Sequence, residues 1–514
     1  MMNLMLYFSK PPTRDELNAL IDKAADIIRT AVDYKFILVL LLLKRMNDLT
    51  LYEKEKAKQD LEKRGLTGRE LEEQLKKEEF YTFKIPEEYL WDNIKKDRRR
   101  LPENLADAIS AIAKMNESLQ GVINRIDFLE FARNDANRTI LSKLVDLFDK
   151  YYFAGNNLSP DVFGDAYEHI LMKFAPEKAK EGEIYTPREV ISLLVNILDP
   201  KPEYSIYDPC CGSGGMLIIS YNYVKDKYGS KEVNKLNLYG QERNADIYAI
   251  CRMNLLLHGI NDHNIVNGDT LMRPRFLNEG KRFDVVIANP PWNQDGYDED
   301  SLKEAELKQR FKYGYTPSSS ADWLWIQHML FSAGEKGKIG IVIDNGALFR
   351  GNAEKAIREK IVRDDLVESV ILLPEKLFYN TGAPGAVIIF NKDKPKERKG
   401  KILFINASNE YIKHPSVRRL NSLSHENIKH IADAYREFKD ISGFCRVVSI
   451  EEVKVNDYNL NVTLYVMPIE KSEQIDIIKE YEELKVLEKE RHEVITRLEQ
   501  YITGIAGTMG ERDE

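Results

Sequence analysis

The sequence predicts a doubly wound α/β domain between a helical N-terminal domain and a helical C-terminal tail. Up to about residue 155, apolar residues recur at steps of three and four, which is typical of helices. After Tyr185, short apolar runs bounded by turn residues alternate with helical stretches, and beyond residue 467 a charge-rich helical pattern returns. The 514 residues are therefore expected to form three domains, over residues 1–155, 156–466 and 467–514.

The first domain is expected to be helical from about Leu17 to Phe148. Its dense apolar run, Phe36–Leu43, is well short of the roughly 20 residues that a membrane span needs, so it predicts a buried helix. Leu51–Lys84 is rich in Glu and Lys at spacings that suit exposed helix pairs. This segment is interpreted as a solvated surface insertion, and the sequence assigns no function to it.

The second domain is expected to contain strands at each of its short apolar runs. Such runs, separated by helices, are typical of a parallel sheet with crossover helices on both faces. The expected strands are Tyr204–Tyr207, Asn237–Gly240, Asn264–Val266, Phe283–Ala288, Lys338–Ile343, Leu366–Leu373 and Ala386–Phe390.

The tail carries an apolar stripe that needs a partner surface. Glu488 and Arg491 interrupt the stripe, which disfavours a long self-pairing zipper. Two interpretations stay open, docking onto a different helical protein and folding back on the N-terminal helices of the same chain. The stripe consists of Ile477, Tyr481, Leu484, Leu487, Ile495, Leu498 and Ile502.

Composition limits the classes of function. A formal net charge of -8 argues against a broad positive field that holds DNA by itself. Each of two basic clusters, Lys95–Arg100 and Lys392–Lys401, is either a solvated loop or a phosphate clamp. No signal peptide is recognised at the start, and no membrane span is expected, so a cytoplasmic protein is predicted. Neither a disulfide framework nor a metal site is expected from Cys210, Cys211, Cys251 and Cys445.

A glycine-rich turn, Asp208–Gly215 (DPCCGSGG), follows the first expected strand. Glycines there let backbone amides approach a ligand outside the carboxyl end of the strand, although such a turn can also be purely structural. The spacing fits neither the ATP-binding nor the dinucleotide-binding pattern, and a carboxylate at Asp208 repels phosphate. Asp208 suits a cationic amine instead, such as the amino group of S-adenosylmethionine.

Two further acids follow the next two expected strands. Glu242 is placed to accept hydrogen bonds from both ribose hydroxyls of a nucleoside, and Asp269 from the exocyclic amine of an adenine. Taken alone, Glu242 is interpreted as an ordinary surface residue and Asp269 as a turn cap. In this order along the chain, Asp208, Glu242 and Asp269 are able to contact one bound nucleoside.

The strand Phe283–Ala288 leads into Asn289-Pro290-Pro291-Trp292. The prolines rigidify the turn, so the side-chain oxygen of Asn289 and the carbonyl of Pro290 can accept from the same amine. Two acceptors hold the nitrogen lone pair toward an incoming methyl group and draw off positive charge as it develops. Trp292 offers a face on which an extruded base can stack. This turn predicts methylation of a planar exocyclic amine.

In this order the motifs resemble those of the gamma-type amino-methyltransferases of DNA, and the flanking segments are similar to modification subunits of type I restriction-modification systems. The similar segments are Lys23–Arg45, Glu183–Arg188, Ser319–Trp323, Asn345–Gly351, Leu377–Gly382 and Asn456–Asn461. The resemblance covers about nine tenths of the chain. It implies a Rossmann-like S-adenosylmethionine-dependent methyltransferase domain that methylates the N6 amine of adenine in a specific DNA sequence and so protects host DNA.

The resemblance also implies site residues and partners. Asn289, Pro290, Pro291 and Trp292 are expected to be catalytic. The implied partners are double-stranded DNA, a specificity subunit bound to two modification subunits through residues 467–514, and a restriction and translocation subunit. The expected cofactor-binding residues are Glu183, Ile184, Tyr185, Thr186, Pro187, Arg188, Asp208, Ser213, Gly214, Gly215, Glu242 and Asp269.

Alternatives remain at this stage. Cytosine N4 is chemically similar to adenine N6 and is not rigorously excluded. A protein or RNA amino-methyltransferase and a non-catalytic scaffold are disfavoured by the flanking segments and by the intact motifs. No Walker A sequence is found, so cleavage is assigned to another subunit, and Cys210 and Cys211 are interpreted as packing residues. The recognised DNA sequence cannot be read from this chain.

Overall fold

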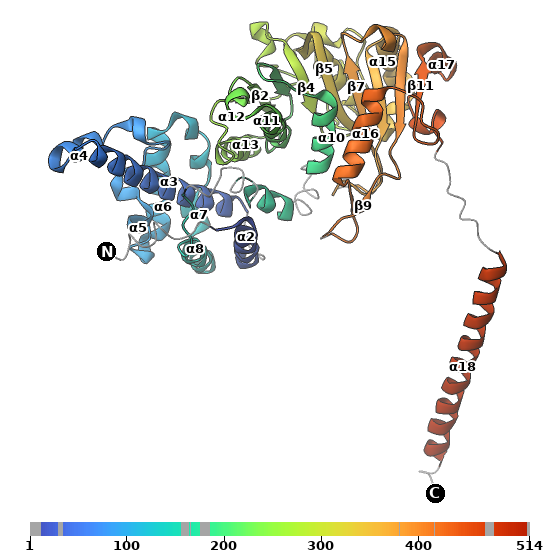
Figure 1. Ribbon diagram of the computed structural model, residues 1–514, viewed down its shortest axis with the longest axis horizontal. Helices are drawn as coiled ribbons and strands as arrows, with labels where there is room; N and C mark the ends of the chain where they lie inside the picture. The colour runs from blue at the N-terminus through green and yellow to red at the C-terminus, as the bar shows by residue number, and fades with distance from the viewer. Residues whose placement is uncertain are drawn as a thin grey trace. The chain divides into compact units, whose positions relative to one another are not determined.

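A computed structural model describes residues 12–28, 34–155, 164, 166–174, 186–379, 381–415, 417–467 and 477–510 (Figure 1). The chain divides into two units, Met1–Met467 and Pro468–Glu514, and each is described by itself.

The N-terminal part of the first unit is helical, and no strand occurs in the described residues up to 155. As expected, Phe36–Leu43 opens a helix whose residues Ile37–Leu43 are buried. The second half of that helix and the turns after it, over the charged segment Leu51–Lys84, are mostly exposed. The helices are α2 (Arg14–Ile28), α3 (Lys35–Lys63), α4 (Gly68–Gln74), α5 (Trp91–Ile94), α6 (Leu101–Met115), α7 (Phe128–Phe131) and α8 (Asp135–Phe148), with 3-10 turns η1 (Glu78–Phe80), η2 (Glu87–Tyr89), η3 (Arg98–Arg100), η4 (Glu117–Leu119) and η5 (Ile123–Arg125).

A nine-stranded sheet follows, in the order β11-β8-β6-β7-β5-β4-β1-β2-β3. All seven strands expected from the sequence are present. The strands are β1 (Ser205–Asp208), β2 (Asn237–Glu242), β3 (Asn264–Asn267), β4 (Phe283–Ala288), β5 (Ala333–Asp344), β6 (Val367–Leu372), β7 (Gly385–Asn391), β8 (Lys401–Asn406) and β11 (Cys445–Ser449).

The sheet is mixed, whereas the sequence pattern predicted a parallel one. Strands β1 to β5 run parallel, β7 is antiparallel to both of its neighbours, β8 is parallel to β6, and β11 is antiparallel to β8. The chain builds β2 and β3 on one side of β1 and then places β4 on the other side. This reversal opens a crevice at the carboxyl ends of β1 and β4, where α/β sheets bind ligands.

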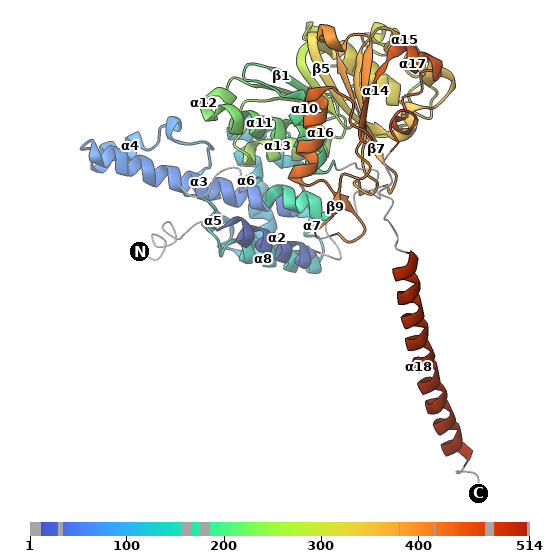
Figure 2. The ribbon, with the colours of Figure 1, turned by 45° about the vertical axis from the view of Figure 1, so that its right-hand side comes forward.

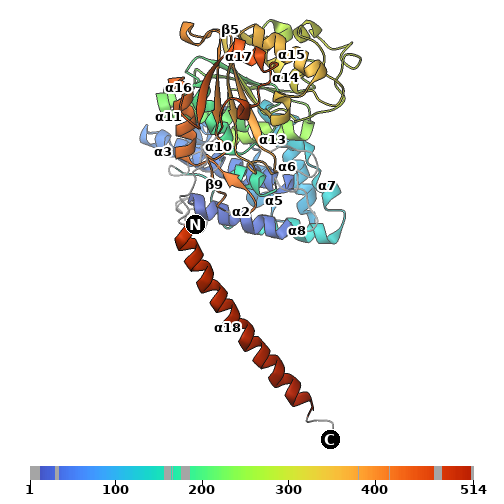
Figure 3. The same ribbon diagram turned by 90° about the vertical axis from the view of Figure 1, so that its right-hand side faces the viewer.

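Helices cover both faces of the sheet, as Figure 3 shows. One face packs against α10, α11, α13 and α16, and the other packs against α14, α15 and α17. The bounds are α10 (Arg188–Leu198), α11 (Gly215–Tyr228), α12 (Ser230–Val233), α13 (Ala245–Leu257), α14 (Asp322–Ser332), α15 (Asn352–Arg363), α16 (His425–Glu437) and α17 (Ile450–Val455), with 3-10 turns η6 (Leu277–Glu279), η7 (Lys308–Phe311), η8 (Asn345–Leu348), η9 (Lys396–Arg398) and η10 (Val462–Leu464).

Helix α13 belongs to two cores. Its residue Cys251 lies in the core formed with β1 and α11, whereas Ile250, Met253 and Leu257 lie in the core of the N-terminal helices. The helical region is therefore packed directly against the α/β sheet through this helix.

A small hairpin, β9 (Ile412–Lys413) paired with β10 (Asn421–Ser422), follows β8. Because β8 is parallel to β6 and β6 has the direction of β5, the chain leaves β8 at the edge where β1 and β4 end. Figure 2 shows this hairpin projecting from the sheet.

The second unit contains the helix α18 (Ile477–Gly510). The stripe residues Tyr481, Leu484, Leu487, Ile495 and Leu498 are all exposed. The side chains of Ile477 and Ile502 lie outside the described residues. In the part of the chain that is described, α18 included, no helix is long and apolar enough to cross a bilayer.

Candidate active site

The sequence motifs meet at the carboxyl edge of the sheet. Asp208 is the last residue of β1, Glu242 is the last residue of β2, and Asn289 directly follows β4. A cavity opens between them and the start of α10. It is lined by Glu168, Thr186, Arg188, Ile191, Asp208, Cys210, Cys211, Gly212, Ser213, Gly215, Met216, Ile219 and Asn289.

The glycine-rich turn adopts a backbone that requires glycine. Gly212 has φ +51° and Gly214 has φ +88°, in the left-handed region that other residues avoid. A Cβ on Gly214 would lie 3.0 Å from the sulfur of Cys251. The Nδ2 of Asn254, on α13, donates to the Ser213 carbonyl at 3.0 Å, so this hydrogen bond ties the turn to α13.

The cysteines of the turn differ in position. Both line the cavity, but Cys211 is buried with its sulfur 3.9 Å from that of Cys251, whereas Cys210 is half-buried. The hydrogen bond with Cys251 and burial hold the pKa of Cys211 well above its usual value, and burial does the same for the pKa of Cys210. Both thiols therefore stay protonated at neutral pH, which suits packing residues rather than nucleophiles.

Asp208 is buried, with 1% of its surface exposed, and its Oδ1 accepts from the Cys210 amide at 3.0 Å. Burial raises the pKa of Asp208 to about 8, against the lowering effect of that amide, and the nearby Glu242 carboxylate adds to the rise. The raised pKa of Asp208 therefore favours the protonated carboxyl at neutral pH.

Glu242 and Asp269 each fasten loops at this edge. Glu242 accepts from the amides of Gly212 at 3.0 Å and Asn244 at 2.7 Å. Asp269 accepts from the Met272 amide at 3.1 Å and from the Tyr297 hydroxyl at 2.6 Å. Neither acid lines the cavity itself, although Glu242 directly contacts its wall at Gly212.

The acceptor turn is held by hydrogen bonds at both ends of the Asn289 amide. Its Nδ2 donates to Thr186 Oγ1 at 2.8 Å, and its Oδ1 accepts from the indole N–H of Trp292 at 2.9 Å. The Trp292 ring packs edge-on against Phe378, with centroids 4.7 Å apart. The amide therefore presents its oxygen on the side of the tryptophan.

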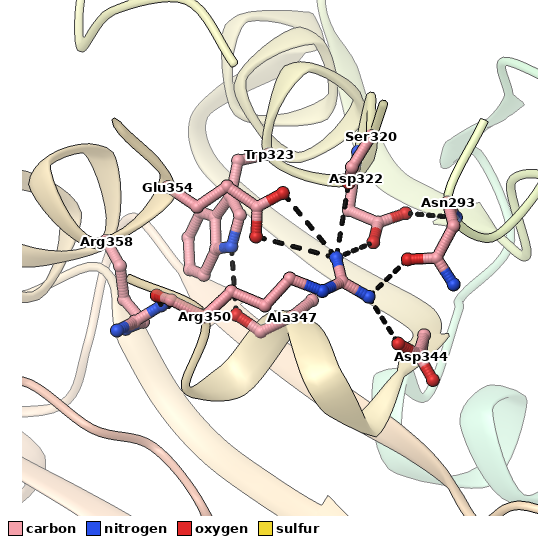
Figure 4. Close-up of polar contacts among 9 residues, drawn as sticks. All are labelled: Asn293, Ser320, Asp322, Trp323, Asp344, Ala347, Arg350, Glu354 and Arg358. Atoms are coloured by element: carbon pink, nitrogen blue, oxygen red, sulfur yellow. Dashed lines mark hydrogen bonds and ion pairs between the residues drawn. The ribbon is translucent and has the colours of Figure 1, made fainter. Parts of the chain in front are cut away.

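Arg350 joins the loops behind the acceptor turn (Figure 4). Its guanidinium donates to the side chains of Asn293 and Asp344, and to Asp322 Oδ2 at 2.7 Å. It also lies 3.5 Å from the Glu354 carboxylate. Asp322 in turn accepts from the Asn293 amide at 3.1 Å. Asn293, the residue after Trp292, therefore forms hydrogen bonds with both Arg350 and Asp322.

The expected site residues fall into three groups. Thr186, Arg188, Asp208, Ser213, Gly215 and Asn289 line the cavity. Pro187, Gly214, Pro290, Pro291 and Trp292 are not among its lining residues, although each lies within three positions of one that is. Glu242 and Asp269 do not line it either, and they lie at the end of β2 and in the connection after β3. Glu183, Ile184 and Tyr185 lie outside the described residues.

Sequence reasoning missed several residues. Ile191, Met216 and Ile219 lie within about one helical turn of Arg188 or Gly215, and that spacing was a usable signal. Glu168, which forms an ion pair with Arg188 at 3.1 Å, gave no signal in the sequence. The contacts of Arg350 gave no signal in the sequence either, because Asn293, for example, lies 57 positions away in the chain.

The basic clusters are partly structural. In Lys392–Lys401, the Nζ of Lys394 contacts Asp365 at 2.6 Å, and Arg398 lies 3.3 Å from Glu368. In Lys95–Arg100, Lys95 lies 2.5 Å from Asp149. These cations are neutralised within the fold, which disfavours a phosphate clamp at their positions.

Comparison with known proteins agrees with the motifs. The family described as N-6 DNA Methylase matches residues 158–474, and the HsdM N-terminal domain matches residues 17–148. The MjaVII type I restriction enzyme methylase subunit of Methanocaldococcus jannaschii is 47% identical over 511 residues, which cover 97% of this chain and 85% of that protein. The HindI methylase subunit of Haemophilus influenzae is 31% identical, covering 79% of this chain and 91% of that protein.

A solved structure gives the same result. The type I restriction-modification methyltransferase subunit from Streptococcus thermophilus superposes with a TM-score of 0.76 at 27% identity, covering 88% of this chain and 100% of that one. With both family matches and a relative of 47% identity along nearly its whole length, the chain belongs to the N-6 DNA methylase family, as a methylase subunit of a type I restriction-modification system.

Proposed function

We propose that S-adenosylmethionine is the methyl donor for the N6 methylation of adenine in DNA that defines this family. The observation that carries the proposal is the convergence of Asp208 and Asn289 on one cavity. A buried carboxyl with a pKa of about 8 fits a cationic amine, which favours its ionised form. When bound, the cofactor supplies the methyl group.

Each acid has a proposed contact. Asp208 binds the amino group of the cofactor, and Glu242, whose oxygens already organise the turn, accepts from the ribose hydroxyls. Asp269 accepts from the exocyclic amine of the cofactor adenine. Ser213, Gly214 and Gly215 allow close approach of the backbone, and Thr186, Pro187 and Arg188 close the cavity at α10, with Glu183, Ile184 and Tyr185 preceding them.

The acceptor turn acts on the target adenine. We assign Asn289 Oδ1 and the Pro290 carbonyl as the acceptors for the adenine amine, and Pro291 as the residue that keeps the turn rigid. Thr186 and Trp292 fix the orientation of the Asn289 amide, so no reorganisation is needed during methyl transfer. The flipped base stacks on Trp292, whose own orientation is fixed by Phe378.

Each of the three parts of the chain has a proposed role. Residues 1–155 are the helical domain, residues 156–466 methylate double-stranded DNA, and residues 467–514 dock onto a specificity subunit that binds two copies of this chain. The exposed stripe on α18 supports this docking role because exposed apolar helical faces mark partner surfaces. Cleavage belongs to a separate restriction and translocation subunit.

One experiment tests the proposal. The chain, co-purified with its specificity subunit, is incubated with methyl-labelled S-adenosylmethionine and genomic DNA, and the labelled base is identified. N6-methyladenine is expected, with no label from an Asn289→Ala complex prepared in the same way. Labelled N4-methylcytosine, or no transfer from this cofactor by a complex that binds DNA, would overturn the proposal.

A further inference from the structure

The β9–β10 hairpin (residues 411–422) projects from the edge that carries the acceptor turn (Figure 2). Two large apolar side chains are exposed where it begins, with Tyr411 40% and Ile412 48% accessible. Large apolar side chains on an exposed hairpin gain nothing from the chain's own core, so they mark a contact surface.

The hairpin is basic within an acidic chain. Residues 411–422 contain Lys413, His414, Arg418 and Arg419 and no Asp or Glu, whereas the whole chain has a net charge of -8. Lys413, Arg418 and Arg419 are exposed, and in the described residues none of the three forms an ion pair with a carboxylate. Lys413 instead donates to Asn421 Oδ1 at 3.0 Å, across the two strands. This charge is therefore available to an acidic partner, unlike the charge of the two basic clusters found in the sequence.

Both walls of the acceptor site are fastened to the base of this hairpin. On one side, Ser422 Oγ donates to the Glu189 carboxylate at 2.7 Å, three residues from the Thr186 that bonds Asn289. On the other side, Asn421 Nδ2 donates to the Glu375 carbonyl at 2.8 Å. That carbonyl begins the loop whose Phe378 packs against Trp292.

We propose that the β9–β10 hairpin binds the duplex next to the flipped adenine, with Lys413, Arg418 and Arg419 on backbone phosphates. Tyr411 and Ile412 pack against the groove beside them. The proposal rests on the methylation of adenine in DNA and adds the surface that grips the substrate. Guanidinium and ammonium groups bind phosphates at every sequence, so this contact positions the duplex and leaves its sequence to be read elsewhere.

Charge favours DNA over a protein partner at this surface. An acidic chain repels a polyanion over most of its surface, so its contact with DNA needs a local basic element close to the reacting base. A hairpin held at its base by Asn421 and Ser422 keeps its cations at a fixed distance from Asn289. Apolar side chains flanked by cations are common where proteins enter a groove and deform the duplex.

The test compares two double variants of the chain in complex with its specificity subunit. Arg418→Gln/Arg419→Gln removes two charges from the hairpin. Lys396→Gln/Lys399→Gln removes two exposed charges from the connection between β7 and β8, at the opposite edge of the sheet. Binding to a duplex oligonucleotide that holds the recognised site is measured as a function of salt concentration.

For the hairpin variant, the slope of log affinity against log salt concentration should fall in magnitude by about two, because each phosphate contact contributes about 0.9. The control variant should keep the wild-type slope, and both should bind S-adenosylmethionine with wild-type affinity by calorimetry. A wild-type slope for the hairpin variant would overturn the proposal. So would loss of the specificity subunit in size-exclusion chromatography, because the hairpin would then be a protein-docking element.

A separate measurement tests the two apolar residues of the hairpin, Tyr411 and Ile412. Tyr411→Ser/Ile412→Ser should lower the fluorescence of 2-aminopurine placed at the target adenine, whereas the exposed Val455→Ser control on α17 should not. Unchanged fluorescence would remove these two side chains from the DNA contact. Because binding and base extrusion are measured apart from methyl transfer, a complex that binds DNA and transfers no methyl group would contradict the proposed function alone.

Discussion

Arg350 and Asp322 form an ion pair, with Arg350 Nη1 2.7 Å from Asp322 Oδ2, and the Asp322 side chain is fully buried (Figure 4). Burial raises the pKa of Asp322, and the guanidinium of Arg350 opposes that rise. The same carboxylate holds the Asn293 amide. The acceptor turn is therefore stabilised by an ion pair whose two residues do not line the cavity.

Replacing Arg350 by alanine should destabilise the protein. Removing one partner of a buried ion pair leaves the other charge uncompensated, which costs about 3–5 kcal/mol in the free energy of unfolding. Urea denaturation measures this loss. Arg69→Ala, which breaks an exposed pair with Glu73, is the control and should cost much less. Similar losses for the two variants would show that the Arg350 ion pair has no special role.

Asn289→Ala should lower the rate of methyl transfer by about 10²–10³, roughly 3–4 kcal/mol, because one preorganised transition-state hydrogen bond is lost. Cofactor affinity should stay close to wild type. Thr186→Val removes the bond that orients the amide and should cost about 1 kcal/mol, roughly five-fold in rate. Single-turnover kinetics separate the two effects, and wild-type turnover of Asn289→Ala would disprove the assigned role.

Asp208→Ala and Glu242→Ala should each weaken the binding of S-adenosylmethionine by about 1.5–3 kcal/mol, since charge-assisted hydrogen bonds to a ligand contribute that much. Isothermal titration calorimetry gives both affinities. Asp284→Ala is a suitable control, because that carboxylate accepts from Ser205 and lies outside the cavity. Unchanged affinity in both site variants would mean that the glycine-rich turn serves another ligand.

The stability of the protein should depend on pH through Asp208. Its pKa is about 8 in the folded protein, above the usual 3.8, so the folded chain binds more protons than the unfolded chain between these values. The free energy of unfolding that Asp208 contributes should therefore fall as pH rises from about 4 to about 8. Asp208→Asn removes this dependence. Urea titrations at pH 5 and pH 8 should show a larger decline for the wild type, and equal declines would contradict the raised pKa.

A chain that ends at Met467 should fold and bind S-adenosylmethionine but lose assembly with the specificity subunit, and with it site-specific methylation. The boundary coincides with the division between the two units. Leu484→Ser/Leu487→Ser tests the stripe without truncation, and Val486→Ser is the control at a similarly exposed position on the opposite face of α18. A complete complex formed by the shortened chain at low micromolar concentration, seen by size-exclusion chromatography, would exclude the tail as the docking element.

The sequence located the strands that a ligand site needs, because buried strands are short apolar runs and turn residues mark their ends. It could not give the direction of β7, since an apolar run such as Gly385–Asn391 reads alike in both directions. Strands β8 and β11 were missed. Lys401–Asn406 follows a basic loop that masks its start, and Cys445–Ser449 lacks a long apolar run.

The same contrast holds for the site. Asp208, Glu242 and Asp269 were expected from their order in the sequence to contact one nucleoside. The structure places Asp208, Glu242 and Asn289 at one edge because the parallel strands that precede them end there. The partner of a side chain such as Arg350 depends on packing between distant loops, which leaves no periodic signal in the sequence. Residue type was the basis for the predicted chemistry of the cavity. The contacts that hold its loops in place, such as those of Arg350, became visible only in the folded structure.

Helix α13 packs against both parts of the first unit, the N-terminal helices and the α/β sheet. Its Cys251 and Asn254 support the glycine-rich turn, while Ile250 and Met253 belong to the core of the N-terminal helices. A molecule whose binding to the helical region moved α13 would therefore alter the floor of the cavity and the affinity for its ligand. Reciprocal linkage would then require that ligand to alter the affinity of the first molecule by the same factor.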